Sequence, residues 1–283
     1  LSPIFTGAVG RKRWKEDEAV AAIAKYFHVA RVSMRARTAY LADFLLGSVF
    51  YALILYVFVQ LWSVIGRTRG FVVEGFGPRE LVWYLMASEA IMLGRARFEQ
   101  ETDEEVKTGA IAYSLNKPYH YVMFKLASYW GETALKMALN IVIGSAVALA
   151  AVGPIPVSIP HLAAVLLCTA LALTLNFFIG MVLGLSAFWV EDTAPFFWIY
   201  SKVLFVLGGL FAPMEIYPDA LARVARATPF NYVLYAPARL FVQFDMDFFL
   251  STVTMQAVWV AVLALLVTAL YGMGVRRLNV NGG

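Results

Sequence analysis

Long apolar runs alternate with short polar segments along the chain. Six of these runs are each close to the roughly 20 residues that an α-helix needs to cross about 30 Å of hydrocarbon. The pattern predicts an all-α membrane protein with six transmembrane helices. The runs lie near residues 41–65, 80–98, 132–152, 161–190, 194–213 and 253–275.

Composition agrees with this class. Of the 283 residues, 61% are hydrophobic and 15% are charged, whereas ordinary soluble domains carry about 25% charged residues. The single cysteine, Cys168, can form no internal disulfide. Basic residues flank the apolar runs, so nucleic-acid binding is a poor explanation for the formal charge of +4. Residues 1–10 lack the apolar core and cleavage site of a signal peptide.

Lysine and arginine are unevenly divided between the two sides of the predicted membrane. Segments 1–40, 95–136 and 276–283 hold 16 of the 23 basic residues, against six on the opposite side. Because cytoplasmic loops carry the excess of positive charge, we expect a multi-pass protein of the cell membrane with both termini in the cytoplasm. Residues 1–40 then form a cytosolic N-terminal segment, and residues 41–283 form the transmembrane domain.

The N-terminal segment combines basic and apolar positions. A basic cluster at residues 11–15 precedes a helical pattern that begins near Glu18, and apolar residues then recur at Ile23, Phe27 and Met34. A basic amphipathic helix of this kind lies at an anionic membrane surface. Two interpretations stay open: the helix only orients the chain, or it also touches a cytosolic partner.

The stretch from Arg97 to Pro118 is the most polar part between two apolar runs. Five acids fall between Glu99 and Glu105. Thr102 followed by Glu105 predicts a capping box at a helix start, and the proline predicts the end. We expect one charged cytosolic helix of about 13 residues, roughly 20 Å long.

The polar segment before the last run predicts two short helices. Pro218 favours a helix over residues 219–227, Thr228–Pro229 breaks it, and an apolar piece follows over residues 230–240. Helices this apolar predict a re-entrant hairpin in the outer half of the bilayer, covered by protein. An ordinary folded loop is the alternative.

Sequence motifs for catalysis and nucleotide binding are absent. The chain has no GxxxxGK[ST], HExxH or GxSxG. Its histidines, His28, His120 and His161, lack metal-ligand spacing. We therefore expect no enzyme active site and no metal site on this chain.

A few polar or small residues interrupt the apolar runs. Glu89 and Lys202 lie at similar depths near the bilayer centre, where a lone charge is costly. We expect them to lie close together or to line one polar cavity, as a structural ion pair or as part of a substrate path. Asn176 is a further candidate for the path. Gly180 and Gly184 form GxxxG and predict close helix packing.

Three segments carry a resemblance to a known family. An amphipathic helix, KYFHVARVSMRARTAYLADF, leads into the first run. A cytosolic helix ending in a Lys-Pro turn follows the second, EEVKTGAIAYSLNKPYHYVMFKLASYWGE. A hairpin with a Pro-aromatic step precedes the last, ATPFNYVLYAPARL. Over residues 20–275 the layout resembles the permease subunits of ABC-2 type exporters, and the Lys117–Pro118 turn is most similar to the branch whose members occur as paired, non-identical permeases.

The resemblance implies an assembly. Two six-helix permeases would associate, and each would dock on a separate ATP-binding subunit that holds ATP and Mg²⁺. The cytosolic helix would act as the coupling helix, and spans one, two and five would flank the translocation path, which fits Glu89 and Lys202. The residues assigned to ATPase coupling are Asp103, Glu104, Glu105, Val106, Lys107, Gly109, Ala110 and Tyr113.

Several alternatives remain open at this level. The acids could face a basic rim on the ATPase, or they could be solvated while Val106, Ala110 and Tyr113 make the contacts. The chain could instead be an ion-coupled secondary transporter, or a membrane anchor for a cytosolic ATPase without transport. A carboxylate among aromatic residues suits hydrophobic cations or amphiphiles, while lipid, polysaccharide and peptide substrates stay open.

Overall fold

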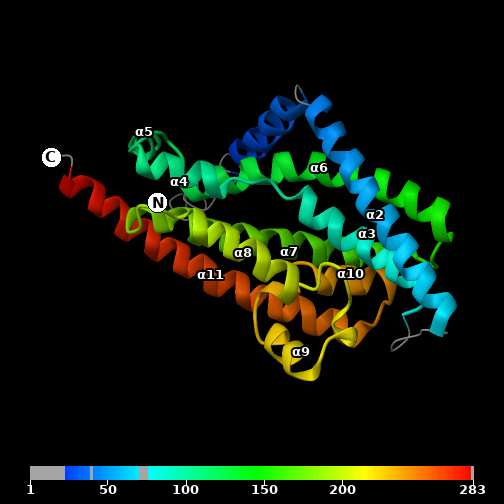
Figure 1. The fold of residues 1–283 in the computed structure, drawn as a ribbon. Helices are drawn as coiled ribbons and strands as arrows, with labels where there is room; N and C mark the ends of the chain where they lie inside the picture. The colour runs from blue at the N-terminus through cyan, green and yellow to red at the C-terminus, as the bar shows by residue number, and fades with distance from the viewer. Residues whose placement is uncertain (1–22, 39–40, 70–75, 282–283) are drawn as a thin grey trace, which may run out of the picture.

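The structure, a computed structural model, describes residues 23–38, 41–69 and 76–281. In these residues all regular elements are helices, and most of them run side by side in one bundle (Figure 1). The predicted basic cluster at residues 11–15 lies outside the described residues, as does Glu18, the predicted start of the N-terminal helix. From residue 23 to residue 38 that helix is present.

The remaining helices follow in chain order. They are α2 (Leu41–Arg69), α3 (Pro78–Gly94), α4 (Glu99–Lys107), α5 (Ile111–Leu115), α6 (Tyr121–Val152), α7 (Ile159–Leu185), η1 (Ser186–Phe188), α8 (Ala194–Leu207), η2 (Met214–Ile216), α9 (Asp219–Arg226), η3 (Phe230–Tyr232), α10 (Tyr235–Val242) and α11 (Met246–Asn281).

Four of the six predicted spans are confirmed as helices long and apolar enough to cross a membrane. They are Gly47–Ile65, Tyr121–Val152, Ile159–Phe188 and Met246–Arg277. The second and fifth predicted spans correspond to α3 and α8, which have 17 and 14 residues. These two helices are too short to be counted on length and composition, so their crossing of the membrane stays a prediction.

The fifth predicted span is shorter than expected because its helix ends early. The apolar run continues to residue 213, but α8 stops at Leu207. Gly209 follows with φ 68°, a left-handed conformation that few residues other than glycine adopt. Hydroxyl groups of α3 satisfy the carbonyls released there: Tyr84 donates to the Gly209 oxygen, and Ser88 donates to the Leu210 oxygen at 2.7 Å.

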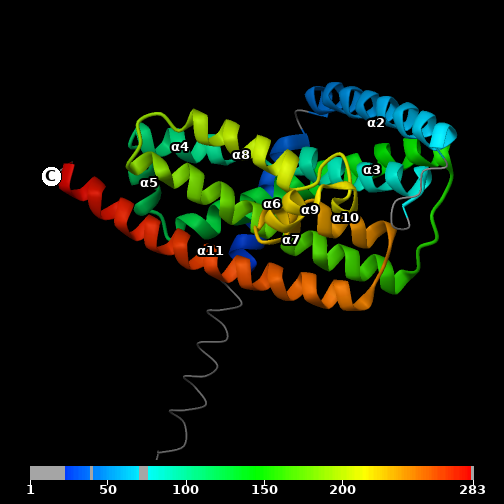
Figure 2. The same cartoon turned by 60° about the horizontal axis from the view of Figure 1, so that its bottom comes forward.

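Two helices are longer than the membrane requires. α6 begins at Tyr121, well before the predicted start at residue 132, and its 32 residues span about 48 Å. α11 has 36 residues. Both reach the end of the bundle where α4 and α5 lie (Figures 1 and 2).

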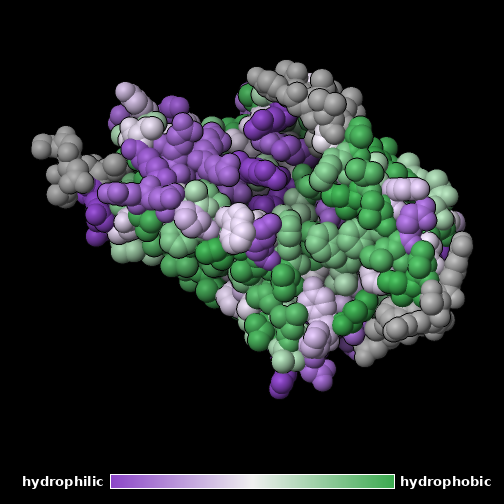
Figure 3. Space-filling model, in the orientation of Figure 1, coloured by the Kyte–Doolittle hydropathy of each residue, from purple (hydrophilic) through white to green (hydrophobic). Residues whose placement is uncertain are grey.

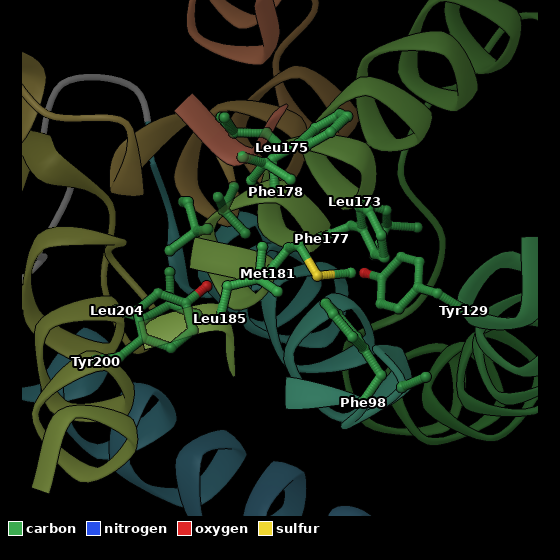
Figure 4. Close-up of a cluster of buried hydrophobic side chains, with 14 of the residues drawn as sticks. Phe98, Tyr129, Leu173, Leu175, Phe177, Phe178, Met181, Leu185, Tyr200 and Leu204 are labelled. Atoms are coloured by element: carbon green, nitrogen blue, oxygen red, sulfur yellow. The ribbon is translucent and has the colours of Figure 1, made fainter. Parts of the chain in front are cut away.

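The core is built around α7. This helix packs against α11 on one side and against α4 and α10 elsewhere, while α6 packs mainly against α3. A cluster of aromatic rings joins α6, α7 and the residue before α4: Phe98 stacks on Phe177 with ring centroids 4.6 Å apart, and Tyr129 lies edge-on to Phe98 at 5.5 Å (Figure 4).

The predicted helix–break–helix segment is confirmed. α9 begins after Pro218 and ends at Arg226, and α10 follows the Thr228–Pro229 break. Most of the residues of α10 are buried, against α3 and α7. An ion pair of 3.0 Å between Arg239 and Glu215 closes the segment. α10 is therefore covered by protein, as expected, whereas α9 is mostly exposed and buries only Ala222 and Ala225. The entry of the segment into the bilayer stays a prediction.

Candidate coupling element and translocation path

α4 and α5 (Glu99–Leu115, here the coupling element) lie across one end of the bundle. α4 rests on the GxxxG face of α7. A Cβ atom added at Gly184 would lie 2.9 Å from the Cβ atom of Thr102, and one added at Gly180 would lie 3.1 Å from the ring of Phe98. The predicted role of both glycines in close packing is thus confirmed, and the packed partner is the coupling element.

The coupling element differs from the predicted single helix. α4 begins at Glu99, one turn before the predicted capping box, so Thr102 is an interior helical residue that is fully buried. The predicted capping box is wrong because Glu105 bonds to α6 instead of to the helix start. The helix also breaks between Lys107 and Ile111, where Gly109 has φ 73°.

The acids of α4 are mostly paired within the chain. Lys125 of α6, which is buried, contacts Glu101 at 3.0 Å and Glu105 at 2.9 Å. Tyr121 donates a further hydrogen bond of 2.5 Å to Glu105. At the start of the helix, Arg95 contacts Glu99 at 3.3 Å.

Asp103 ties the coupling element to the start of α8. Its carboxylate contacts Lys107 at 2.9 Å and accepts a hydrogen bond of 2.5 Å from the hydroxyl of Thr193, the residue before α8. Lys107 donates to the same hydroxyl at 3.3 Å. The coupling element is therefore bonded to α6 and α8 as well as packed on α7.

The outward side of the coupling element offers a different set of residues. Val106 is buried, so its side chain packs within the chain and is not presented to a partner. Tyr113, in contrast, is 77% exposed, and Leu115 is also exposed. Glu104 is exposed and has no ion pair among the described residues, unlike the other four acids. Figure 3 shows hydrophilic residues gathered over this end of the molecule.

The N-terminal helix is bonded to the turn that follows the coupling element. Lys25 donates to the Pro118 carbonyl oxygen at 2.9 Å, and the His120 backbone N–H donates to the Tyr26 hydroxyl at 3.1 Å. At Gly131 of α6 the two helices are so close that an added Cβ atom would lie 2.0 Å from a backbone oxygen of the N-terminal helix.

Glu89 is buried without a partner. Its side chain is 3% exposed, and within the described residues it has neither an ion pair nor a hydrogen bond. The Tyr51 phenol of α2 lies within electrostatic reach. An isolated carboxyl group in an apolar interior is costly to keep charged, so this position is unusual for a purely structural residue.

Lys202 is placed differently from the expectation. It is exposed on α8, and its ammonium group lies over the rings of Trp198 and Phe205 at 5.5 and 5.2 Å. No ion pair joins it to Glu89 in the part of the chain that the structure describes. The predicted proximity of the two charges is not found as a direct contact.

Asn176 is a buried junction between three helices. Its side-chain oxygen accepts a hydrogen bond of 2.5 Å from Tyr200 of α8, and its amide donates to Tyr129 of α6 at 3.3 Å. Both polar groups of this amide are therefore used inside the chain, which accounts for an asparagine in an apolar helix. Its place in the path stays a prediction.

Three residues of this arrangement were missed at the level of sequence. They are Lys125, Arg95 and Thr193, which hold the acids of α4. Lys125 carried a usable signal, because it is a single cation in the apolar start of α6 and lies one turn after Tyr121. Thr193 carried none, since only the fold brings it beside residue 103.

Comparison with known proteins places this arrangement in a family. A family model described as ABC-2 family transporter protein matches residues 44–282. A comparison with curated proteins finds no match.

Proposed function

This chain belongs to the ABC-2 transporter family, and we propose that it is the permease subunit of an ATP-driven exporter in the cell membrane. Separate ATP-binding subunits would hold ATP and Mg²⁺, and both termini would lie in the cytoplasm. The observation that carries the proposal is the coupling element, which is bonded to α6 and to the start of α8, packs on α7, and exposes Tyr113 on its outer side.

The inner bonds make the coupling element suitable for transmitting motion. A displacement of α4 acts on α6 through Lys125, on α8 through Asp103 and Thr193, and on α7 through the two glycines. Two of these helices, α6 and α7, are long and extend far along the bundle. A small movement at the ATPase contact therefore becomes a shift of packed helices, because packed interfaces switch between discrete arrangements.

A few exposed residues of the coupling element are the candidates for contact with an ATP-binding subunit. Tyr113 and Leu115 supply exposed apolar area, and an exposed tyrosine is a frequent energetic centre of protein interfaces. Glu104 supplies the unpaired charge. Of the predicted acidic contacts, Glu104 is the one available for steering a basic partner, since its neighbours Asp103 and Glu105 are engaged inside the chain.

A second permease would cover the faces of α2 and α8. These two helices leave large side chains exposed, including Phe50 and Tyr56 on α2 and Trp198 and Ile199 on α8. Lys202 lies on the same exposed part of α8, so it would face the junction of the two permeases. The second permease would be either an identical chain or a paralogue.

Glu89 is the candidate recognition group in the path. It is buried, with Tyr51 of α2 within electrostatic reach, so a substrate would reach it only after the surrounding helices move. An unpartnered carboxyl near aromatic residues favours a hydrophobic cation as substrate, through charge pairing and contacts with ring faces.

The experiment is reconstitution of the permease in vesicles with and without a co-expressed ATP-binding subunit. We expect export of a hydrophobic cation such as a rhodamine dye only with the ATPase present and ATP supplied. Transport driven by an ion gradient without the ATPase would favour a secondary transporter. Complex formation without any transport would favour a membrane anchor.

A further inference from the structure

A long apolar cleft opens between α6 and α7. It has a volume of about 750 Å³, its floor is formed by α3 and α10, and neither Glu89 nor any residue of the coupling element lines it. Its wall on α6 runs from Trp130 to Leu149, which is about 28 Å at 1.5 Å per residue. The cleft thus extends over most of the thickness of a hydrocarbon core.

The cleft exists because α6 and α7 pack on other helices. α6 packs mainly on α3 and α7 mainly on α11, although α6 and α7 follow each other in the chain. Their connection, residues 153–158, contains Pro154 and Pro156, which stiffen it. Trp83 donates to the Gly153 carbonyl at 2.9 Å and so fixes the connection to α3.

Small side chains deepen the cleft. Ala134 and Ala138 line it from α6, Ala170 lines it from α7, and Ala87 and Ala90 lie in its floor. Small residues on membrane helices usually let two helices approach closely. Here they face an opening, so the space that they leave is available to a ligand.

The chemistry of the walls selects the ligand. None of the residues that line the cleft is charged, and two of its walls are helices apolar enough to span the membrane. A side opening at this depth faces lipid instead of water. The volume lies in the range of small-molecule sites, roughly 300–1,000 Å³, and the length of the cleft along α6 suits an extended hydrocarbon chain.

We propose that the α6–α7 cleft binds an acyl chain of a membrane phospholipid as a persistent ligand that fills the gap between the two helices. The chain lies along the alanine-lined wall of α6, with Trp130 at one end. This ligand holds α6 and α7 apart at a fixed spacing.

Native mass spectrometry of the purified protein after detergent exchange tests the proposal. We expect a retained phospholipid on the natural sequence. Ala138→Phe and Ala170→Phe, which fill the cleft from opposite walls, should each lose most of it. Val142→Phe is the matched control, because Val142 is exposed on α6 outside the cleft, and it should keep the lipid. Equal retention in all four proteins, or none in the natural sequence, would overturn the proposal.

A second measurement leaves the alanines of the cleft unchanged. In vesicles of dibrominated phosphatidylcholine, the fluorescence of a variant that keeps Trp130 as its single tryptophan should be strongly quenched. A variant whose single tryptophan is introduced by Leu265→Trp, at a position exposed on α11, reports contact with bulk lipid. Quenching at position 265 alone would show that protein occupies the cleft, and the lipid proposal would fail.

Discussion

The ammonium group of Lys125 lies 2.9 Å from the carboxylate of Glu105, and this ion pair joins α6 to the coupling element. Lys125 is buried, so the pair works where water screens it little. Burying one charged partner without the other is strongly unfavourable. Loss of this contact therefore frees α4 from α6, one of the longest helices in the bundle.

Lys125→Met should uncouple ATP hydrolysis from transport. The methionine fills a similar volume, but Glu101 and Glu105 lose their shared cation, at a cost of roughly 1 kcal/mol because water can solvate both carboxylates. We expect fewer substrate molecules exported per ATP hydrolysed, measured in vesicles with the ATP-binding subunit. The complex itself should still be recovered, because Tyr113 is untouched. An unchanged transport ratio would show that the pair has no part in coupling.

Gly184→Ala should lower thermal stability. The added Cβ atom would lie 2.9 Å from the Thr102 Cβ atom and 3.0 Å from a backbone oxygen, so α4 must shift, and overpacking of this kind costs about 1–3 kcal/mol. Gly180→Ala meets the ring of Phe98 at 3.1 Å and should be milder.

Gly272→Ala is the matched control for both glycine variants. It lies in α11 with no atom within 4 Å of an added Cβ, and it should be neutral or slightly stabilising through helix propensity. Melting curves in detergent should give the lowest melting temperature for Gly184→Ala, an intermediate one for Gly180→Ala and the highest for Gly272→Ala. A Gly184→Ala protein as stable as the control would contradict the close approach of α4 to α7.

Glu104→Lys should weaken the complex with the ATP-binding subunit at low salt. A charge at the rim of an interface changes mainly the association rate, and the effect should fade at high ionic strength because of screening. Asp247→Lys is the control, since Asp247 is an exposed acid at the other end of the bundle. If both reversals had equal effects on complex recovery, the electrostatic contact would be excluded.

Glu89→Gln should reduce transport of hydrophobic cations and leave the protein at least as stable. The glutamine removes the charge of a group that has no partner in the described chain, so folding loses no ion pair. Comparing transport of a cationic and a neutral dye by the same vesicles separates recognition of a cation by Glu89 from a general effect on transport. Equal transport of both dyes by the variant and by the natural sequence would remove Glu89 from the path.

The sequence predicted the membrane class, the polar helix between spans two and three, and the helix–break–helix before the last span. These features follow from local patterns: long apolar runs, five clustered acids, and proline breaks. The GxxxG pair was also predicted to pack closely, because glycine spacing has a direct steric meaning. Local patterns therefore carried most of the layout.

Partners across the fold could not be predicted. The capping box at Thr102 failed because Glu105 binds Lys125, twenty residues further along, in preference to its own helix start. Val106 resembled a contact residue but is buried by packing. The end of α8 depended on hydroxyls of α3, more than a hundred residues away. Contacts of this kind depend on how the helices pack together, and local sequence patterns do not show that.

Photo-cross-linking at position 113 tests the central claim most directly. A photoreactive phenylalanine analogue replaces Tyr113, whose side chain is 77% exposed at the outer side of the coupling element. The same analogue at Val157, exposed in the connection at the opposite end of α6, is the control. We predict a covalent product between position 113 and a separate ATP-binding subunit, and none from position 157. A product from both positions, or from neither in an intact complex, would contradict the assignment of α4 and α5 as the coupling element.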